Sequence, residues 1–163
     1  MNLSSFTTFT WIHVILSLVA LVSGLIVVIG LLGAKKLDGW TALYLASSVA
    51  TSATGFGFPF DHFLPSHWIG VISLVLLAVA IVARYVLHLA GAWRWIYVIS
   101  LVTTVFFMVF VTIAQAFQKV PALKALAPTQ SEPPFAIAEL AALVVFVVLA
   151  VAAVKKFRIG AAV

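Results

Sequence analysis

The residues most able to do chemistry lie in and near one short connection, FPFDHFLPSHW at 58–68, in an otherwise apolar chain. Imidazole nitrogens and carboxylate oxygens are ligands for zinc and copper. A set of three such nitrogens and one such oxygen is available from His13, His62, His67 and Asp61. Two facing neutral imidazoles on parallel helices would instead hold the iron of haem b, and His13 and His67 are the candidates.

Each histidine also has a simpler interpretation. His62 beside Asp61 is explained by a solvated loop, and His67 after Ser66 by a helix cap or a membrane interface. His13 is more informative, because it lies more than two turns inside a first helix that begins near Ser4, and an ionisable residue at that depth indicates a functional site. A polar interfacial turn whose histidines only face water is therefore the alternative to a ligand site.

A second polar group is expected at the same end of the molecule. Gln115 and Gln118 end the fourth apolar segment, and Glu139 lies about one turn inside the fifth. A carboxyl group at this depth must face protein or water, so we expect Glu139 to pair with Lys119 or to hydrogen-bond Gln115. The proline-rich connection over 119–134 is expected to form a rigid, non-helical lid on the same side.

The composition places these groups in a membrane protein. Of the 163 residues, 65% are hydrophobic and 8% charged, whereas about 25% are charged in a typical soluble domain. No soluble core could hide this much apolar surface, so the lipid bilayer is the expected solvent. The net charge of +5 does not indicate nucleic acid, because the basic residues stand in short clusters at the ends of apolar segments. The chain has no cysteine, which excludes thiolate-ligated zinc and iron–sulfur clusters.

Five apolar segments predict an all-α fold, a membrane bundle that forms a single transmembrane domain over 1–163. Each segment is near or above the ~20 residues that a spanning helix needs. The expected helices cover about 6–33, 40–58, 67–90, 93–118 and 135–155, with outer loops at 59–66 and 119–134. The second helix is rich in small polar residues, which predicts close packing at the centre of the bundle, with Ala20 and Gly24 as its partner surface. A pore-lining hydroxyl stripe is the alternative.

The basic residues indicate that the second helix also spans. If all five segments cross, only Lys119 and Lys124 lie on one side; if the second does not cross, the basic residues divide almost evenly. The seven residues on the other side are Lys35, Lys36, Arg84, Arg94, Lys155, Lys156 and Arg158. The positive-inside rule then predicts an outer N-terminus and a cytoplasmic C-terminus. His13 and His67 would begin two parallel helices at the outer side and face each other.

At the cytoplasmic end the sequence gives no comparable cluster. His88 follows Arg84 by one turn, and both are expected to snorkel towards the cytoplasm. The following AWRWIYV run is typical of an interfacial anchor, with aromatic rings at the level of the lipid headgroups.

Four runs resemble a group of small, uncharacterised multi-pass inner-membrane proteins of proteobacteria: LDGWTALYLA, FPFDHFLPSH, ARYVLHLAGAWRWIYV and QAFQKVPALKALAPTQSEPPF. The resemblance spans nearly the whole chain and implies a bacterial inner membrane and multi-pass helices; it implies no activity. A histidine at the outer start of each of two parallel helices is also similar to membrane b-type cytochromes, which implies haem b as the cofactor.

Three classes of function fit these observations. The favoured one is a redox protein that binds haem b or a metal ion and exchanges electrons with quinone under the proline-rich lid. The second is a small oligomeric channel or transporter lined by Gln115, Glu139 and the hydroxyls of the second helix. The third is an accessory subunit with no chemistry of its own. The expected partners are the lipid bilayer and either further copies of the chain or a larger membrane complex.

Overall fold

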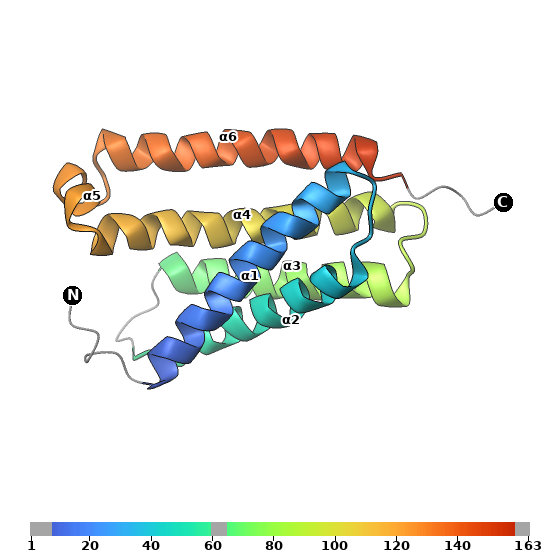
Figure 1. The fold of residues 1–163 in the computed structure, drawn as a ribbon, viewed down its shortest axis with the longest axis horizontal. Helices are drawn as coiled ribbons and strands as arrows, with labels where there is room; N and C mark the ends of the chain where they lie inside the picture. The colour runs from blue at the N-terminus through green and yellow to red at the C-terminus, as the bar shows by residue number, and fades with distance from the viewer. Residues whose placement is uncertain (1–7, 60–64, 159–163) are drawn as a thin grey trace.

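The computed structural model describes residues 8–59 and 65–158, and this part of the chain is helical with no strand. The elements in chain order are α1 (Thr8–Leu32), α2 (Asp38–Gly55), α3 (Pro65–Ile81), the π-helix η2 (Val82–Val86), α4 (Trp93–Lys119), α5 (Pro121–Leu126) and α6 (Pro133–Lys156). Helices α3, α4 and α6 run side by side, and α1 crosses them obliquely to end near the C-terminal end of α6 (Figure 1). The prediction of an all-α bundle is confirmed.

Four of the described helices are long and apolar enough to cross a membrane: Thr8–Leu32, Ser66–Val86, Trp93–Lys119 and Pro133–Lys156. They make this a multi-pass membrane protein by length and composition. Helix α2 is not among them, because serine, threonine and glycine fill much of its second half. It nevertheless packs against both α1 and α3 inside the bundle.

Close contact between α1 and α2 depends on a glycine, as the small residues of both helices predicted. A Cβ atom at Gly24 would lie 2.8 Å from Cε2 of Tyr44 and 3.0 Å from Cγ2 of Val105. The Tyr44 ring fills the space that Gly24 leaves, and its hydroxyl donates a hydrogen bond of 2.7 Å to Oγ1 of Thr104 on α4. Thr104 in turn donates to the carbonyl of Leu101. The buried phenol therefore joins three helices.

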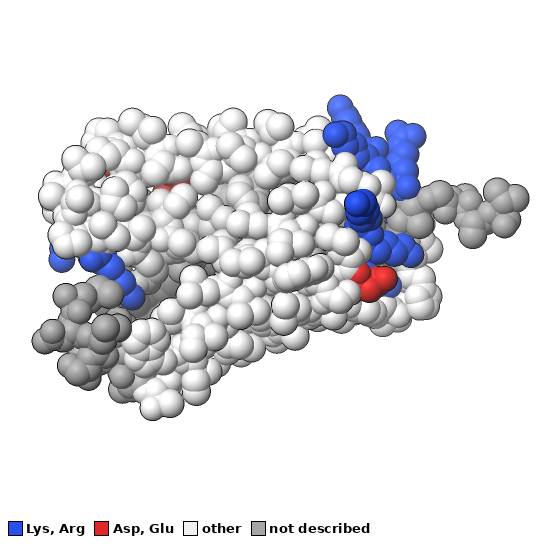
Figure 2. Space-filling view, viewed as in Figure 1, with Lys and Arg blue, Asp and Glu red and all other residues white. Residues whose placement is uncertain are grey.

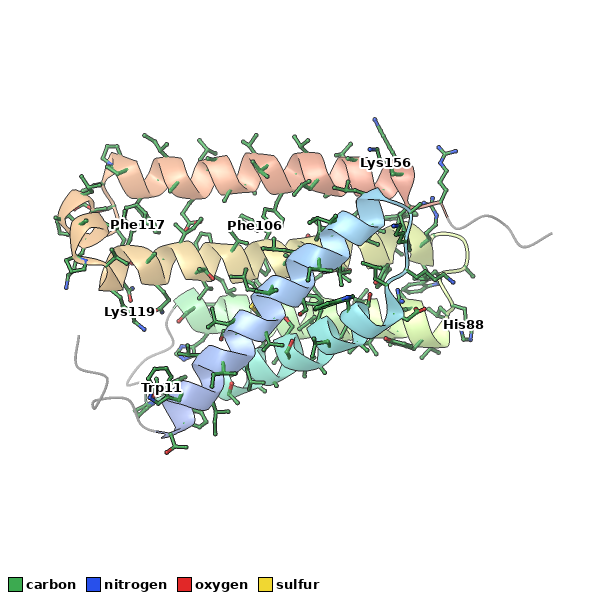
Figure 3. The ribbon with its side chains drawn as sticks, viewed as in Figure 1. Trp11, His88, Phe106, Phe117, Lys119 and Lys156 are labelled. Carbon is green, nitrogen blue, oxygen red and sulfur yellow. The ribbon has the colours of Figure 1, made fainter. Side chains whose placement is uncertain are left out.

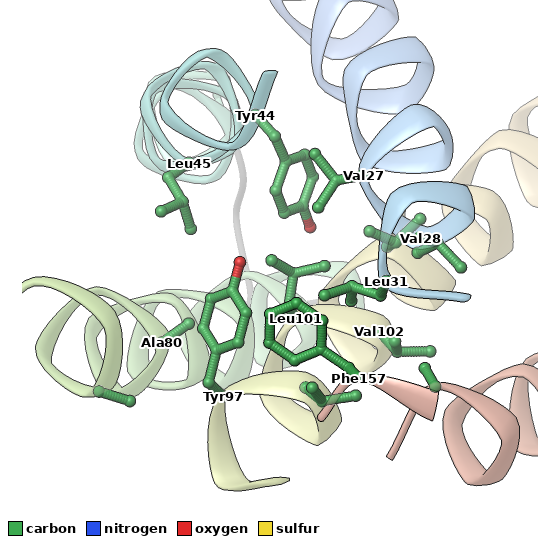
Figure 4. Packing of buried hydrophobic residues seen from close by; sticks show 14 of the residues in the cluster. Val27, Val28, Leu31, Tyr44, Leu45, Ala80, Tyr97, Leu101, Val102 and Phe157 are labelled. Atoms are coloured by element: carbon green, nitrogen blue, oxygen red, sulfur yellow. The ribbon is translucent and has the colours of Figure 1, made fainter. Parts of the chain in front are cut away.

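The hydrophobic core surrounds this tyrosine. Side chains from every long helix enter it, together with Phe157 just after α6 (Figure 4). Fully buried members include Leu31 of α1, Leu77 of α3 and Leu101 of α4. In contrast, α6 leaves a broad apolar face exposed: Ile137, Leu140, Leu143, Val144, Val145, Val147, Val148 and Val151. Lipid is the natural contact for such a face.

Two connections differ from the expected loops. The segment 119–134 is not a non-helical lid, because Pro121–Leu126 forms the short helix α5. Proline is compatible with the first turn of a helix, where its missing N–H would have no partner, and it stands there in both α5 and α6. Helix α2 ends at Gly55 and α3 begins at Pro65, so the connection between them covers 56–64 instead of the expected 59–66.

The two ends of the bundle differ in charge (Figure 2). We call one the basic end; it carries Lys35, Lys36, Arg84, Arg94, Lys155, Lys156 and Arg158. We call the other the histidine end; it carries His13, His67, Lys119 and Lys124. Figure 3 marks the contrast, with Trp11 and Lys119 at the histidine end and His88 and Lys156 at the basic end.

Candidate functional site

His13 of α1 is fixed by the C-terminal turn of α2. Its Nδ1 lies 2.8 Å from Oγ1 of Thr54. The Thr54 hydroxyl oxygen also lies 2.7 Å from the carbonyl oxygen of Ala50 and 3.1 Å from that of Thr51, and a threonine in a helix commonly donates to the carbonyl four residues back. We assign its single hydrogen to Ala50, so that its oxygen accepts the bond from His13 and the ring proton is assigned to Nδ1. The other ring nitrogen, Nε2, keeps an unprotonated lone pair, which is the form that binds a metal ion.

Aromatic rings hold the same imidazole from the side. The ring of Phe58 meets the His13 ring edge-on, with centroids 5.0 Å apart and planes at 87°. Phe9 packs on Phe58 in a similar way at 5.1 Å. This packing needs Gly57, because a Cβ atom there would lie 2.6 Å from Cζ of Phe9. The imidazole thus has one hydrogen-bonded edge and an aromatic wall.

His67 also lies beside the C-terminal end of α2. It lies in the first turn of α3 and is 7% exposed, with its ring 5.6 Å from that of Phe56. Phe56 also packs over Gly70, where a Cβ atom would lie 3.2 Å from its ring. A histidine this buried does not simply face water.

The segment 54–58 therefore contacts both predicted haem ligands, His13 from α1 and His67 from α3. Asp61 and His62, the other members of the predicted metal set, lie outside the described residues. Among the residues that the structure does describe, no three His, Asp or Glu side chains form a group that could hold a metal ion. Within that part of the chain, the ligand candidates are His13 and His67.

Glu139 does not make the contact expected of it. It is buried, and neither of its carboxylate oxygens has a hydrogen-bond partner within the described residues. The expected bonds to Gln115 and Lys119 are therefore wrong. Glu139 shares a helix face with Phe135, whose ring packs on Phe117 of α4 at 5.4 Å. Gln115 lies two residues before Phe117, so the helical repeat turns it away from α6, and it is exposed.

Gln118 has a structural role at the histidine end. Its Nε2 donates to Oε1 of Gln130 at 3.1 Å, and Nε2 of Gln130 donates to the carbonyl of Ala114 at 2.7 Å. These bonds hold the loop after α5 against α4. They also close one side of a cavity of about 420 Å³ lined by Phe117, Gln118, Lys119, Lys124, Pro128, Thr129 and Gln130.

The same loop is tied together by Glu132. Its carboxylate accepts hydrogen bonds from the backbone N–H groups of Thr129 and Ser131 and from the Thr129 hydroxyl. Partial desolvation acts to raise the pKa of Glu132, but these hydrogen bonds outweigh it and hold the pKa below its ordinary value. The loop is thus ordered by side-chain bonds rather than by its prolines alone.

At the basic end the structure contains a network that the sequence did not indicate. Arg84 does not snorkel to water; its side chain is 4% exposed and forms an ion pair with Asp38. It also donates to the Tyr97 hydroxyl at 3.0 Å and to the carbonyl of Lys36 at 3.2 Å. The π-helix η2 sets the direction of Arg84, and its partners come from 46 and 13 residues away in the sequence. The one available signal was Asp38, an acid among basic residues.

No family model, curated protein or solved structure matches this chain. The function of the chain is therefore inferred from the geometry of its histidine end and of its basic end.

Proposed function

We propose that this chain is a five-helix protein of the bacterial inner membrane that binds haem b or a first-row metal ion at its outer end through His13 and His67. The observation that carries the proposal is the bond from Nδ1 of His13 to Thr54. Metal-ligating histidines usually donate their other ring N–H to a fixed acceptor, which sets the tautomer and the ring orientation. Thr54 is such an acceptor.

The surroundings suit an apolar cofactor. Phe9, Phe56 and Phe58 line the two imidazoles, and bundle cores commonly hold cofactors between side chains of facing helices. When bound, haem b supplies one-electron transfer, and quinone is the proposed electron partner. The protein residues orient the imidazoles and exclude water.

The proposed topology includes α2 as a span. Its 18 residues give a length of about 27 Å at about 1.5 Å per residue, close to the ~30 Å hydrocarbon core. Packing on α1 and α3 and the Tyr44–Thr104 bond place it inside the bundle. With five spans, seven of the nine basic residues lie at one end, which the positive-inside rule makes cytoplasmic.

Cysteine labelling tests this topology directly, because the chain has no cysteine of its own. Lys124→Cys should react with an impermeant maleimide on intact cells. Lys36→Cys should react only after the inner membrane is opened. Labelling of Lys36→Cys on intact cells would refute the five-span arrangement.

The cofactor itself is tested by spectroscopy and metal analysis of the protein purified in mild detergent. We expect a Soret band or a bound metal ion in the wild type, and loss of it in both His13→Ala and His67→Ala. His88→Ala, at the opposite end, is the matched control, and His62→Ala should lose little. A wild-type protein that carries neither group and takes up neither haem nor metal on reconstitution would refute the proposal.

A second candidate function rests on Glu139. A buried carboxyl inside a spanning helix that has no hydrogen bond to the described residues is typical of ion pathways and of contacts with a further subunit. An oligomeric channel or transporter would use it. Glu139→Gln should then abolish proton or cation flux in liposomes or shift the oligomeric state in native mass spectrometry. If it changes neither, this function is excluded.

A further inference from the structure

A small cavity opens at the basic end, far from the two histidines of the proposed cofactor site. Its volume is about 140 Å³, and its walls are Lys36, Asp38, Arg84, Tyr85, His88 and Leu89. A water molecule needs only about 10–15 Å³ of such space, so a phosphate-sized group has room. The cavity lies between the start of α2 and η2, near the labelled His88 in Figure 3.

Arg84 forms a fixed part of the cavity wall. Its guanidinium is held by Tyr97, the Lys36 carbonyl and Asp38, and it lies 5.5 Å from the centre of the Tyr97 ring. A buried arginine fixed in this way has little rotamer freedom left to lose when a ligand binds. Arginine is also the side chain best suited to phosphate recognition.

The backbone around Arg84 is unusual in a way that shapes the cavity. Leu87 N–H bonds the carbonyl of Val82 at 3.0 Å, five residues back, and such π-turns occur frequently at functional sites. His88 and Leu89 then adopt left-handed conformations, with φ of 49° and 59°. This reversal places His88 on the wall of the cavity instead of continuing the helix.

The charges of the lining favour an anion. Lys36 and Arg84 are positive and Asp38 is negative, which leaves a net charge of +1 with His88 neutral. Asp38 is 83% exposed and the Arg84 side chain only 4%, so water screens the carboxylate more strongly than the guanidinium. Further basic residues lie at the same end of the molecule (Figure 2): Lys35, Arg94, Lys155, Lys156 and Arg158. In a spanning bundle this end lies at the headgroup level, where basic pockets between helices bind anionic headgroups.

We propose that this cavity binds a phosphate group, held by Arg84 and Lys36 and contacted by His88. The phosphate would come from the headgroup of an anionic phospholipid or from phosphate in solution. The site does not depend on the cofactor at the other end.

The test uses the full-length protein, delipidated in a neutral detergent. Short-chain phosphatidylglycerol, short-chain phosphatidylcholine and inorganic phosphate are titrated separately, and binding is followed by native mass spectrometry and thermal melting. Phosphatidylglycerol should bind more tightly than phosphatidylcholine. If inorganic phosphate also binds and competes, the source is free phosphate; if it does not, the source is the lipid headgroup. Failure of both phosphatidylglycerol and phosphate to bind would overturn the proposal.

A pair of variants ties the binding to the cavity. Lys36 contributes its backbone carbonyl to the Arg84 network, which Lys36→Gln leaves in place, so this variant should fold. Lys35→Gln removes the same charge from the neighbouring position, which does not line the cavity. Lys36→Gln should weaken binding about fivefold, since a basic residue near an anionic headgroup contributes roughly this factor, and Lys35→Gln less than twofold. Equal weakening by both variants would indicate a general charge effect and overturn the site.

Discussion

Replacing Gly24 with alanine should loosen the packing of α2 against α1. The new Cβ atom would lie 2.8 Å from the Tyr44 ring and 3.0 Å from Val105, so the ring must move by several tenths of an ångström. Tyr44 is fully buried and its hydroxyl is bonded to Thr104, which leaves the ring no free direction. The methyl group therefore strains the contact or breaks the hydrogen bond.

The expected size of the effect follows from three contributions. Overpacking a core typically costs about 1–3 kcal/mol. Loss of the Tyr44–Thr104 hydrogen bond costs about 1 kcal/mol. The higher helix propensity of alanine stabilises the folded state by roughly 1 kcal/mol. The last two cancel, so Gly24→Ala should lower the free energy of unfolding by about 1–3 kcal/mol.

Unfolding in mixed micelles by increasing SDS, followed by tryptophan fluorescence, measures this change; the chain has five tryptophans. Gly39→Ala is the matched control, because a Cβ atom there meets nothing within 4 Å; it should be neutral or stabilise by about 0.4–1 kcal/mol. If the methyl at Gly24 displaces the Tyr44 hydroxyl, Tyr44→Phe should cost less in the Gly24→Ala background than alone. A Gly24→Ala protein as stable as the wild type would refute this account of how α2 is held.

Three further predictions concern the two ends of the bundle. Asp38→Asn should lower the free energy of unfolding by about 1–2 kcal/mol. This is less than the ~3–5 kcal/mol lost on breaking a fully buried ion pair, because Asp38 is largely exposed. Equilibrium unfolding measures the change, with Lys35→Gln as the control variant. Thr54→Val should weaken metal or haem affinity about 10–100-fold in a titration, because His13 loses its orienting acceptor. Glu132 has a pKa below its unfolded value of 4.5, so it stabilises the fold above that pH and loses this contribution as the pH falls through the lower, folded pKa. Glu132→Gln should flatten the decline in melting temperature between about pH 5 and pH 3; an unchanged profile would contradict the role of its hydrogen bonds.

The sequence was a good guide to features that repeat along a helix. Hydrophobic length predicted the multi-pass helical class, and small residues predicted the α1–α2 contact at Gly24, since both signals are local and periodic. It also directed attention to His13, because an ionisable residue deep in an apolar segment needs a partner, and Thr54 is that partner. Which residue of α2 would supply the bond depended on the relative rotation of two helices, which no local pattern encodes.

The errors come from side-chain direction and from distant partners. Arg84 looked like a snorkelling residue because the α-helical repeat puts it near a helix end; the π-turn and the distant Tyr97 and Asp38 make it an interior group. Gln115 was expected to bond Glu139 because both lie towards the outer end of their helices, whereas Phe117 and Phe135 fill the contact between α4 and α6 there, and Gln115 is turned away from α6. The helix at Pro121–Leu126 was missed because prolines were interpreted as helix breakers where they are helix starters.

The π-turn at η2 also makes this chain sensitive to changes in length. Each residue of an α-helix advances the chain by about 100° and 1.5 Å, and the wider turn at Val82–Val86 absorbs one residue that an unbroken α-helix would not. Deleting one residue within Val82–Val86 would close the wide turn into a regular helix and change the direction of the side chains inside it, so that the arginine would no longer face Tyr97. Insertions and deletions at this point therefore act as mutations of Arg84, even when Arg84 itself is unchanged.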